Sequence, residues 1–92
     1  MLNALYRIEM FITERTDNLK DRRKVLSSMR TKLGKFNASI RFEEEGSTLR
    51  NATLWVSYLA MRNSELDSFD SQLKEELYKY PVEIRAVKRD IV

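Results

Sequence analysis

The fold is decided near the middle of the chain by the stretch Asn51-Ala52-Thr53-Leu54-Trp55-Val56-Ser57-Tyr58-Leu59-Ala60-Met61. Its residues alternate between two faces, and β-branched and aromatic side chains are frequent, which is typical of a β-strand. One face carries Ala52, Leu54, Val56, Tyr58 and Ala60, and the opposite face carries Thr53, Trp55, Ser57 and Leu59. The first set is the more continuous apolar surface, so we expect it to face a covering layer of helices.

The residues after this stretch predict a helix and then a strand. Asn63 or Ser64 can cap the helix, with Asp67 as the capping-box partner of Ser64, and Pro81 ends it. The apolar stripe of the helix is Leu66, Phe69, Leu73, Leu77 and Tyr80. Residues 82–91 predict a last strand, with Val82, Ile84 and Ala86 as its clearest apolar face.

The residues before the stretch repeat the order strand, helix, strand. Residues 2–13 alternate, with Leu2, Ala4, Tyr6, Ile8, Met10 and Ile12 on one face. Residues 19–33 predict a helix with a stripe of Leu19, Leu26, Met29 and Leu33 and with Val25 beside it. Asp17 or Asn18 can cap its start, and Gly34 suits a left-handed C-terminal cap. Residues 37–43 predict the second strand, with Ala38, Ile40 and Phe42 on one face, and residues 44–47 predict a polar hairpin loop.

The element order βαββαβ predicts the topology of a single α+β domain over residues 1–92. Each β-α-β half needs a right-handed crossover, and a short hairpin joins the two middle strands. We therefore expect a ferredoxin-like sandwich with an antiparallel sheet of strand order 4-1-3-2 and both helices on one face.

The composition excludes several kinds of chemistry. The 92 residues include no cysteine and no histidine, which removes disulfides, thiolate nucleophiles, histidine bases and the usual zinc ligand sets. Glu43, Glu44 and Glu45 do not converge on one metal ion, because consecutive strand residues point to opposite faces. We therefore expect a non-catalytic protein without a metal or cofactor. Its apolar runs are too short to cross a membrane.

Positive charge is concentrated in one part of the chain. Residues 19–41 hold eight lysines and arginines against Asp21 alone, although the net charge of the whole chain is only +3. On a helix, Lys20, Arg23 and Lys24 lie close together, and Arg30 and Lys35 extend the charge toward the C-terminal end. These five residues are the candidate contacts to nucleic-acid phosphates. The alternative is a solvated helix face whose last-turn cations favour the helix dipole.

The sheet face opposite the helices is a second candidate site. It carries Leu5, Phe11, Trp55 and Leu59 on the two central strands, and four such residues left exposed together predict an interface. A homodimer through this face is favoured over stacking of RNA bases, because the third strand lacks the Gly- and aromatic-rich signature of an RNA-recognition motif.

Four segments resemble the bacterial YlxP-like family of unknown function. These are Asn18-Leu19-Lys20-Asp21-Arg22-Arg23-Lys24-Val25-Leu26, Lys35-Phe36-Asn37-Ala38-Ser39-Ile40, Ala52-Thr53-Leu54-Trp55-Val56 and Arg89-Asp90-Ile91-Val92. The resemblance implies a ferredoxin-like fold, a small cytoplasmic protein and a genomic context of translation and ribosome-maturation factors. The chain departs from the family where Ser47 and Leu49 replace an Asp and a Trp, and where Trp55 replaces a Gly.

Two functions follow as expectations. The first is a small RNA- or ribosome-associated accessory protein that binds phosphates through the basic first helix. The alternative is a homodimeric protein-interaction or regulatory module that acts through the open sheet face around Phe11 and Trp55.

Overall fold

A four-stranded antiparallel sheet forms one layer of the computed structural model, which describes residues 1–13, 18–43 and 50–92. β1 (Leu2–Ile12) lies inside the sheet, between β3 (Asn51–Ala60) and β4 (Val82–Ile91), and β2 (Ser39–Phe42) pairs with the far side of β3. The order β2-β3-β1-β4 is the predicted 4-1-3-2 order read from the other edge. The α+β class and the ferredoxin-like arrangement are thereby confirmed.

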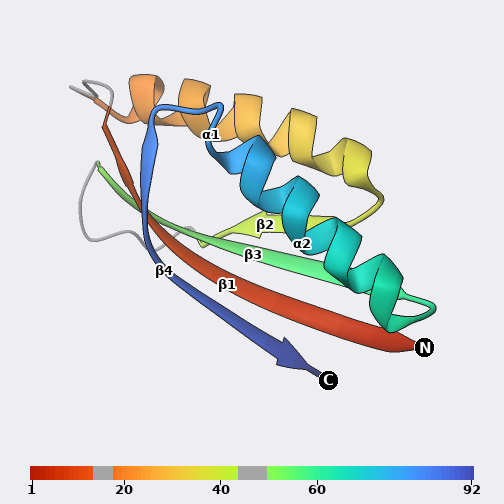
Figure 1. Ribbon diagram of the computed structural model, residues 1–92. Coiled ribbons are helices and arrows are strands. Elements are labelled where there is room, and N and C mark those ends of the chain that lie inside the picture. Colours follow the sequence, from red (N-terminus) through yellow and green to blue (C-terminus); the bar gives the residue numbers. More distant parts are fainter. Residues whose placement is uncertain (14–17, 44–49) are drawn as a thin grey trace.

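Two helices form the second layer, α1 (Leu19–Leu33) and α2 (Asn63–Leu77), and both lie on the same face of the sheet (Figure 1). The hydrophobic core fills the space between the layers. Its largest fully buried side chains are Ile8, Met10, Ile12, Met29, Leu33, Leu54 and Val56. The alternation of buried and half-exposed residues along β1 and β3 follows the predicted two-residue period. No helix within the described ranges is long and apolar enough to span a membrane.

Two tyrosines connect the sheet to α2 through carboxylates. Tyr6 on β1 donates its hydroxyl to Asp70, and Tyr58 on β3 donates to Glu65 Oε1 at 3.0 Å. The ring of Tyr58 also stacks on Phe69, with ring centroids 3.9 Å apart. These two rings therefore pack at the core while their hydroxyls donate to acidic groups at its rim.

The last strand differs from its predicted facing. A bulge interrupts the β1–β4 pairing. Met10 lies opposite Ile84 and Glu9 lies opposite Ala86, so Arg85 has no paired residue on β1. The extra residue moves Ala86 to the open face beside Glu9, so its assignment to the apolar face is wrong. Beyond the bulge, Val87 pairs with Ile8 and takes the helix-facing position in the register, although its side chain is 51% exposed.

The capping predictions are only partly right. Asn18 caps α1 by accepting a hydrogen bond from the Asp21 amide at 3.0 Å, as predicted, and Asp17 lies outside the described residues. Gly34 is not left-handed, because the chain continues into a 3₁₀ turn, η1 (Gly34–Phe36). The left-handed residue is Asn37, with φ of 62°. The extra turn moves the chain reversal three residues later than predicted.

The start of α2 and the extent of β2 also differ from the prediction. The N-cap of α2 is Arg62, which makes no side-chain capping bond, so the predicted caps Asn63 and Ser64 are wrong. Glu65 in the first turn reaches back before the helix, where its Oε2 accepts the Met61 amide N–H at 3.3 Å. β2 spans only residues 39–42 of the predicted 37–43. The predicted loop at 44–47 lies outside the described residues.

Candidate nucleic-acid interface on α1

One side of α1 is fixed to the core by an apolar stripe. Leu26, Met29 and Leu33 are buried, and Val25 packs at the edge of the core. The spacing of three and four residues places these side chains on one face of the helix. The opposite face is therefore turned to solvent along the whole helix.

All five predicted phosphate contacts lie on the exposed surface of α1 and of the turn after it. The five are Lys20, Arg23, Lys24, Arg30 and Lys35, and we call them the basic face. Lys20 and Lys24 are one helical turn apart, whereas Arg23 and Arg30 are two turns apart. Small hydroxyl side chains occupy exposed positions between them, at Ser27, Ser28 and Thr31. The helix therefore presents a row of cations with little bulk between them.

The cations of the basic face form no ion pair with any carboxylate in the part of the chain that the structure describes. Elsewhere several cations do have such partners: Arg7 pairs with Glu9 and Arg89 pairs with Asp70, both at 2.5 Å. Within residues 1–13, 18–43 and 50–92, the five cations are thus not neutralised by an ion pair with an acid. Binding of a polyanion to such cations releases counterions, which favours association at low salt.

A groove runs between α1 and β2. It encloses about 600 Å³ and is lined by Arg22, Arg23, Leu26, Ser27, Arg30, Phe42 and Glu43. We call it the arginine groove. Arg23 and Arg30 stand on its helix side, and the guanidinium of Arg30 lies 5.9 Å from the centroid of the Phe42 ring. Two residues of the basic face therefore also form the wall of a concave site.

Sequence reasoning did not single out Arg22, which belongs to this groove. Its side chain is buried, and its Nη1 donates to the carbonyl oxygen of Asn51 on β3 at 2.5 Å. Burial lowers the pKa of the Arg22 guanidinium. The signal in the sequence was its spacing, because Arg22 stands four residues before Leu26, on the stripe that faces the core.

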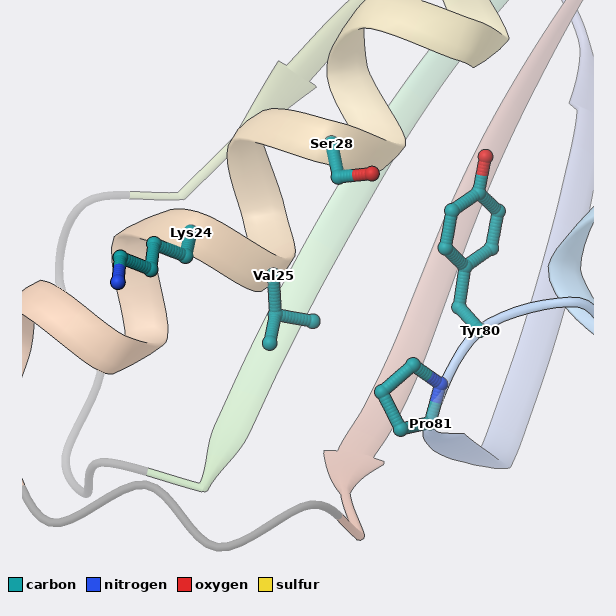
Figure 2. A pocket seen from close by; sticks show the side chains of 5 residues that line it. All are labelled: Lys24, Val25, Ser28, Tyr80 and Pro81. Carbon is teal, nitrogen blue, oxygen red and sulfur yellow. The ribbon is translucent and has the colours of Figure 1, made fainter.

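The other flank of α1 carries a smaller hollow of about 200 Å³, beside the turn between α2 and β4 (Figure 2). Val25 and Ser28 project toward Tyr80 and Pro81, whereas Lys24 points away from them in this view. Lys24 lines this hollow, whereas Arg23 and Arg30 line the arginine groove, so they lie on different flanks of the same helix. This separation makes Lys24 a useful control for the groove.

The four residues predicted as an interface lie on the open face of the sheet. Leu5 pairs with Ser57, so Trp55 and Leu59 are its diagonal neighbours, and these three form one patch. Phe11 lies further along β1 and is separated from the patch by Arg7 and Glu9. The structure therefore brings together three of the four predicted residues.

Polar groups partly cover the aromatic rings of this face. The indole of Trp55 donates to Glu43 Oε1 at 2.8 Å, and the guanidinium of Arg7 lies 5.8 Å from its ring centroid. The guanidinium of Arg85 lies 4.9 Å from the centroid of Phe11. Of the predicted set, only Leu59 is largely exposed, at 60%.

Metal chemistry has no visible support. The described ranges contain no group of three or more acidic side chains placed to hold a metal ion. Burial and hydrogen bonds to acidic groups raise the pKa values of Tyr6, Tyr58 and Tyr80. Hydrogen bonds with Lys79 and Tyr80 lower the pKa of Glu76, although burial opposes them. These groups stabilise the packing of α2 and do not converge on the arginine groove.

The sheet order and the paired helices define a small ferredoxin-like α+β protein with a basic helix and an open sheet face. The chain belongs to the family described as "Protein of unknown function (DUF503)", whose model matches residues 4–90. No curated protein and no solved structure matches it. The resemblance to a family of unknown function is thereby confirmed at that level, and the YlxP-like name and a bacterial origin stay predictions.

Proposed function

We propose that this protein is a non-catalytic accessory protein that binds RNA, free or in the ribosome, through the phosphates of the RNA backbone. The observation that carries the proposal is the basic face of α1, where exposed cations lack carboxylate partners within the described ranges. The proposal includes the expected cytoplasmic location, where such an RNA partner is found.

The rigidity of α1 supports this function. The helix is capped by Asn18 at its start and packed against the core by its apolar stripe, so the backbone that carries its cations is held in place. Fixed cations lose less conformational freedom on binding than cations on a loose tail. Arginine adds a planar fork that matches two phosphate oxygens. The alternative is a solvated face whose charge serves only solubility and the helix dipole.

A salt series separates these two explanations. Purified protein is titrated into labelled structured RNA and labelled single-stranded RNA at increasing salt, beside the variant K20E/R23E/K24E. We expect micromolar or tighter binding at low salt that falls steeply as salt rises, because phosphate contacts release counterions. The triple variant should lower the slope of log K against log salt by about 2 for single strands, since each phosphate contact contributes about 0.7.

The matched control is R62E/K74E/K88E, which makes the same change in net charge at exposed positions away from α1. It should retain most of the binding. Equal loss in both triple variants would show that only the net charge matters. No binding by the wild-type protein even at low salt would leave the basic face as a solvated helix surface.

Self-association through the open sheet face is the second candidate. The observation in its favour is the contiguous patch of Leu5, Trp55 and Leu59, with Leu59 mostly exposed at its end. Exposed apolar patches on small proteins commonly mark an interface. A homodimer formed in this way would leave α1 turned outward, because the helices cover the opposite face of the sheet.

A further inference from the structure

We propose that the arginine groove between α1 and β2 binds one unpaired nucleotide of single-stranded RNA. The phosphate would lie on Arg23 and Arg30, and the base would enter the groove toward Leu26 and Phe42. This inference rests on the proposed RNA binding for its biological ligand, and it adds a preference for unpaired over double-stranded RNA.

The helix side of the groove suits a phosphate. Arg23 and Arg30 line it without a carboxylate partner in the described ranges, and each guanidinium offers a fork of N–H donors. Arg22 adds a third guanidinium that is held in place by its 2.5 Å bond to the Asn51 carbonyl. Three arginines therefore line one concavity.

The floor of the groove is apolar. Leu26 and Phe42 are core residues whose edges line it, and the Arg30 guanidinium lies near the Phe42 ring. A hydrophobic floor below a charged rim matches a nucleotide, which has a charged phosphate at one end and a flat ring at the other. A guanidinium near an aromatic ring also offers a plane on which a base can stack.

The shape and the charge of the groove select among polyanions. A volume of about 600 Å³ admits a single nucleotide, whereas the bases of an RNA duplex are stacked inside the helix and cannot enter. Glu43 also lines the groove. Its Oε1 accepts the indole N–H of Trp55 at 2.8 Å, so this carboxylate is already bonded to a residue that does not line the groove. The volume and the arginines of the groove therefore suit one unpaired nucleotide.

The test compares two RNA probes, an adenine-rich single strand and a blunt duplex of the same length, at one salt concentration. The variants are Arg30→Gln in the groove and Lys24→Gln on the opposite flank of the same helix. Each removes one exposed cation, so they are matched in charge. We expect Arg30→Gln to weaken single-strand binding about tenfold and duplex binding much less, because it removes a charge-assisted contact inside the groove. Lys24→Gln should weaken both probes by similar factors.

Amide chemical shifts locate the binding directly. Both probes should perturb amides on the exposed side of α1, which includes Ser27 and Arg30, whereas only the single strand should perturb the amide of Phe42. Equal effects of Arg30→Gln and Lys24→Gln on both probes, with no shift at Phe42, would overturn the groove site and leave general phosphate binding intact. Tighter binding of oligoglutamate than of RNA, lost in Arg30→Gln, would also overturn it in favour of an acidic peptide.

Failure of the proposed function gives a different result. If the wild-type protein binds neither RNA probe, titration with adenosine monophosphate still tests the groove. Saturable shifts at Arg30 and Phe42 would support a nucleotide site without RNA binding, and their absence would end both proposals.

Discussion

The hydroxyl of Tyr80 donates a hydrogen bond of 2.9 Å to Oε1 of the buried carboxylate of Glu76. The other carboxylate oxygen lies 3.0 Å from Nζ of Lys79. These two partners stabilise the charged form, so the pKa of Glu76 lies below its ordinary value of 4.5 despite the opposing effect of burial. Tyr80 and Lys79 therefore hold the charged carboxylate of Glu76 in place at the C-terminal end of α2.

This arrangement predicts an acid-dependent loss of stability. Because the folded pKa is lowered, the stabilisation is complete above the unfolded pKa of 4.5 and is lost as pH falls through the folded pKa. Glu76→Gln should cost about 1–3 kcal/mol at pH 7, since it removes charged hydrogen bonds. Urea unfolding of both proteins from pH 7 to pH 2 measures the difference, which should shrink in acid. The exposed neighbour Glu75, changed to Gln, is the control and should show no such convergence.

The hydroxyl of Tyr6 leads us to expect a loss of stability at high pH rather than at low pH. Burial and the bond to Asp70 raise the pKa of its hydroxyl well above 10.0. A raised folded pKa means that the stabilisation is complete below the unfolded pKa and is lost as pH rises toward the folded pKa. Tyr6→Phe should cost about 1 kcal/mol at pH 8 and should flatten the fall in stability above pH 10. Urea midpoints between pH 8 and pH 11 test this, and an unchanged slope would show that Tyr6 ionises freely in the folded protein.

We predict that replacing Gly34 by alanine stabilises the folded protein. Its φ of −60° is helical, and a Cβ atom placed there would meet nothing within 4 Å. Gly34→Ala should therefore raise the free energy of unfolding by about 0.4–1 kcal/mol, mainly by restricting the unfolded chain. Asn37→Ala is the contrasting control, because φ is 62° at that residue and alanine would be strained there by about 1–2 kcal/mol. Denaturant midpoints of the two variants should move in opposite directions.

The element order and strand order were predictable because they follow from periodicity and chain connectivity. The alternation along β1 and β3 and the stripe of α1 each repeat over several residues, so one exception does not hide them. The identity of the residues at chain reversals was less predictable. Gly34 and Asn37 both suit a left-handed position, and only the added 3₁₀ turn decides between them.

The candidate site was predictable in its composition but not in its shape. The five cations of the basic face were visible as exposed helix positions, and all of them are exposed in the structure. The arginine groove depends on how α1 crosses β2, which no local pattern encodes. Arg22 shows the same limit, since its partner Asn51 lies on β3, far away in the sequence. The bulge that displaces Ala86 likewise depends on pairing between β1 and β4.

The last prediction concerns self-association through the open face of the sheet. If Leu5, Trp55 and Leu59 are covered by a second copy, Leu59→Glu should shift the protein from dimer to monomer, because it places a charge inside an apolar contact. Trp55→Glu should do the same, although it also places a second acid beside Glu43. Sedimentation measures the mass of each variant, and far-ultraviolet circular dichroism checks that it remains folded.

Met61→Glu is the matched control for Leu59→Glu, because Met61 is similarly exposed, at 66% against 60%, but lies just beyond the end of β3. It should leave the oligomeric state unchanged. A fully dimeric Leu59→Glu and Trp55→Glu would remove the sheet face as the interface. A wild-type protein that sediments as a monomer at high concentration would remove self-association altogether, and the two aromatic rings would then be explained by their contacts with Arg7, Arg85 and Glu43.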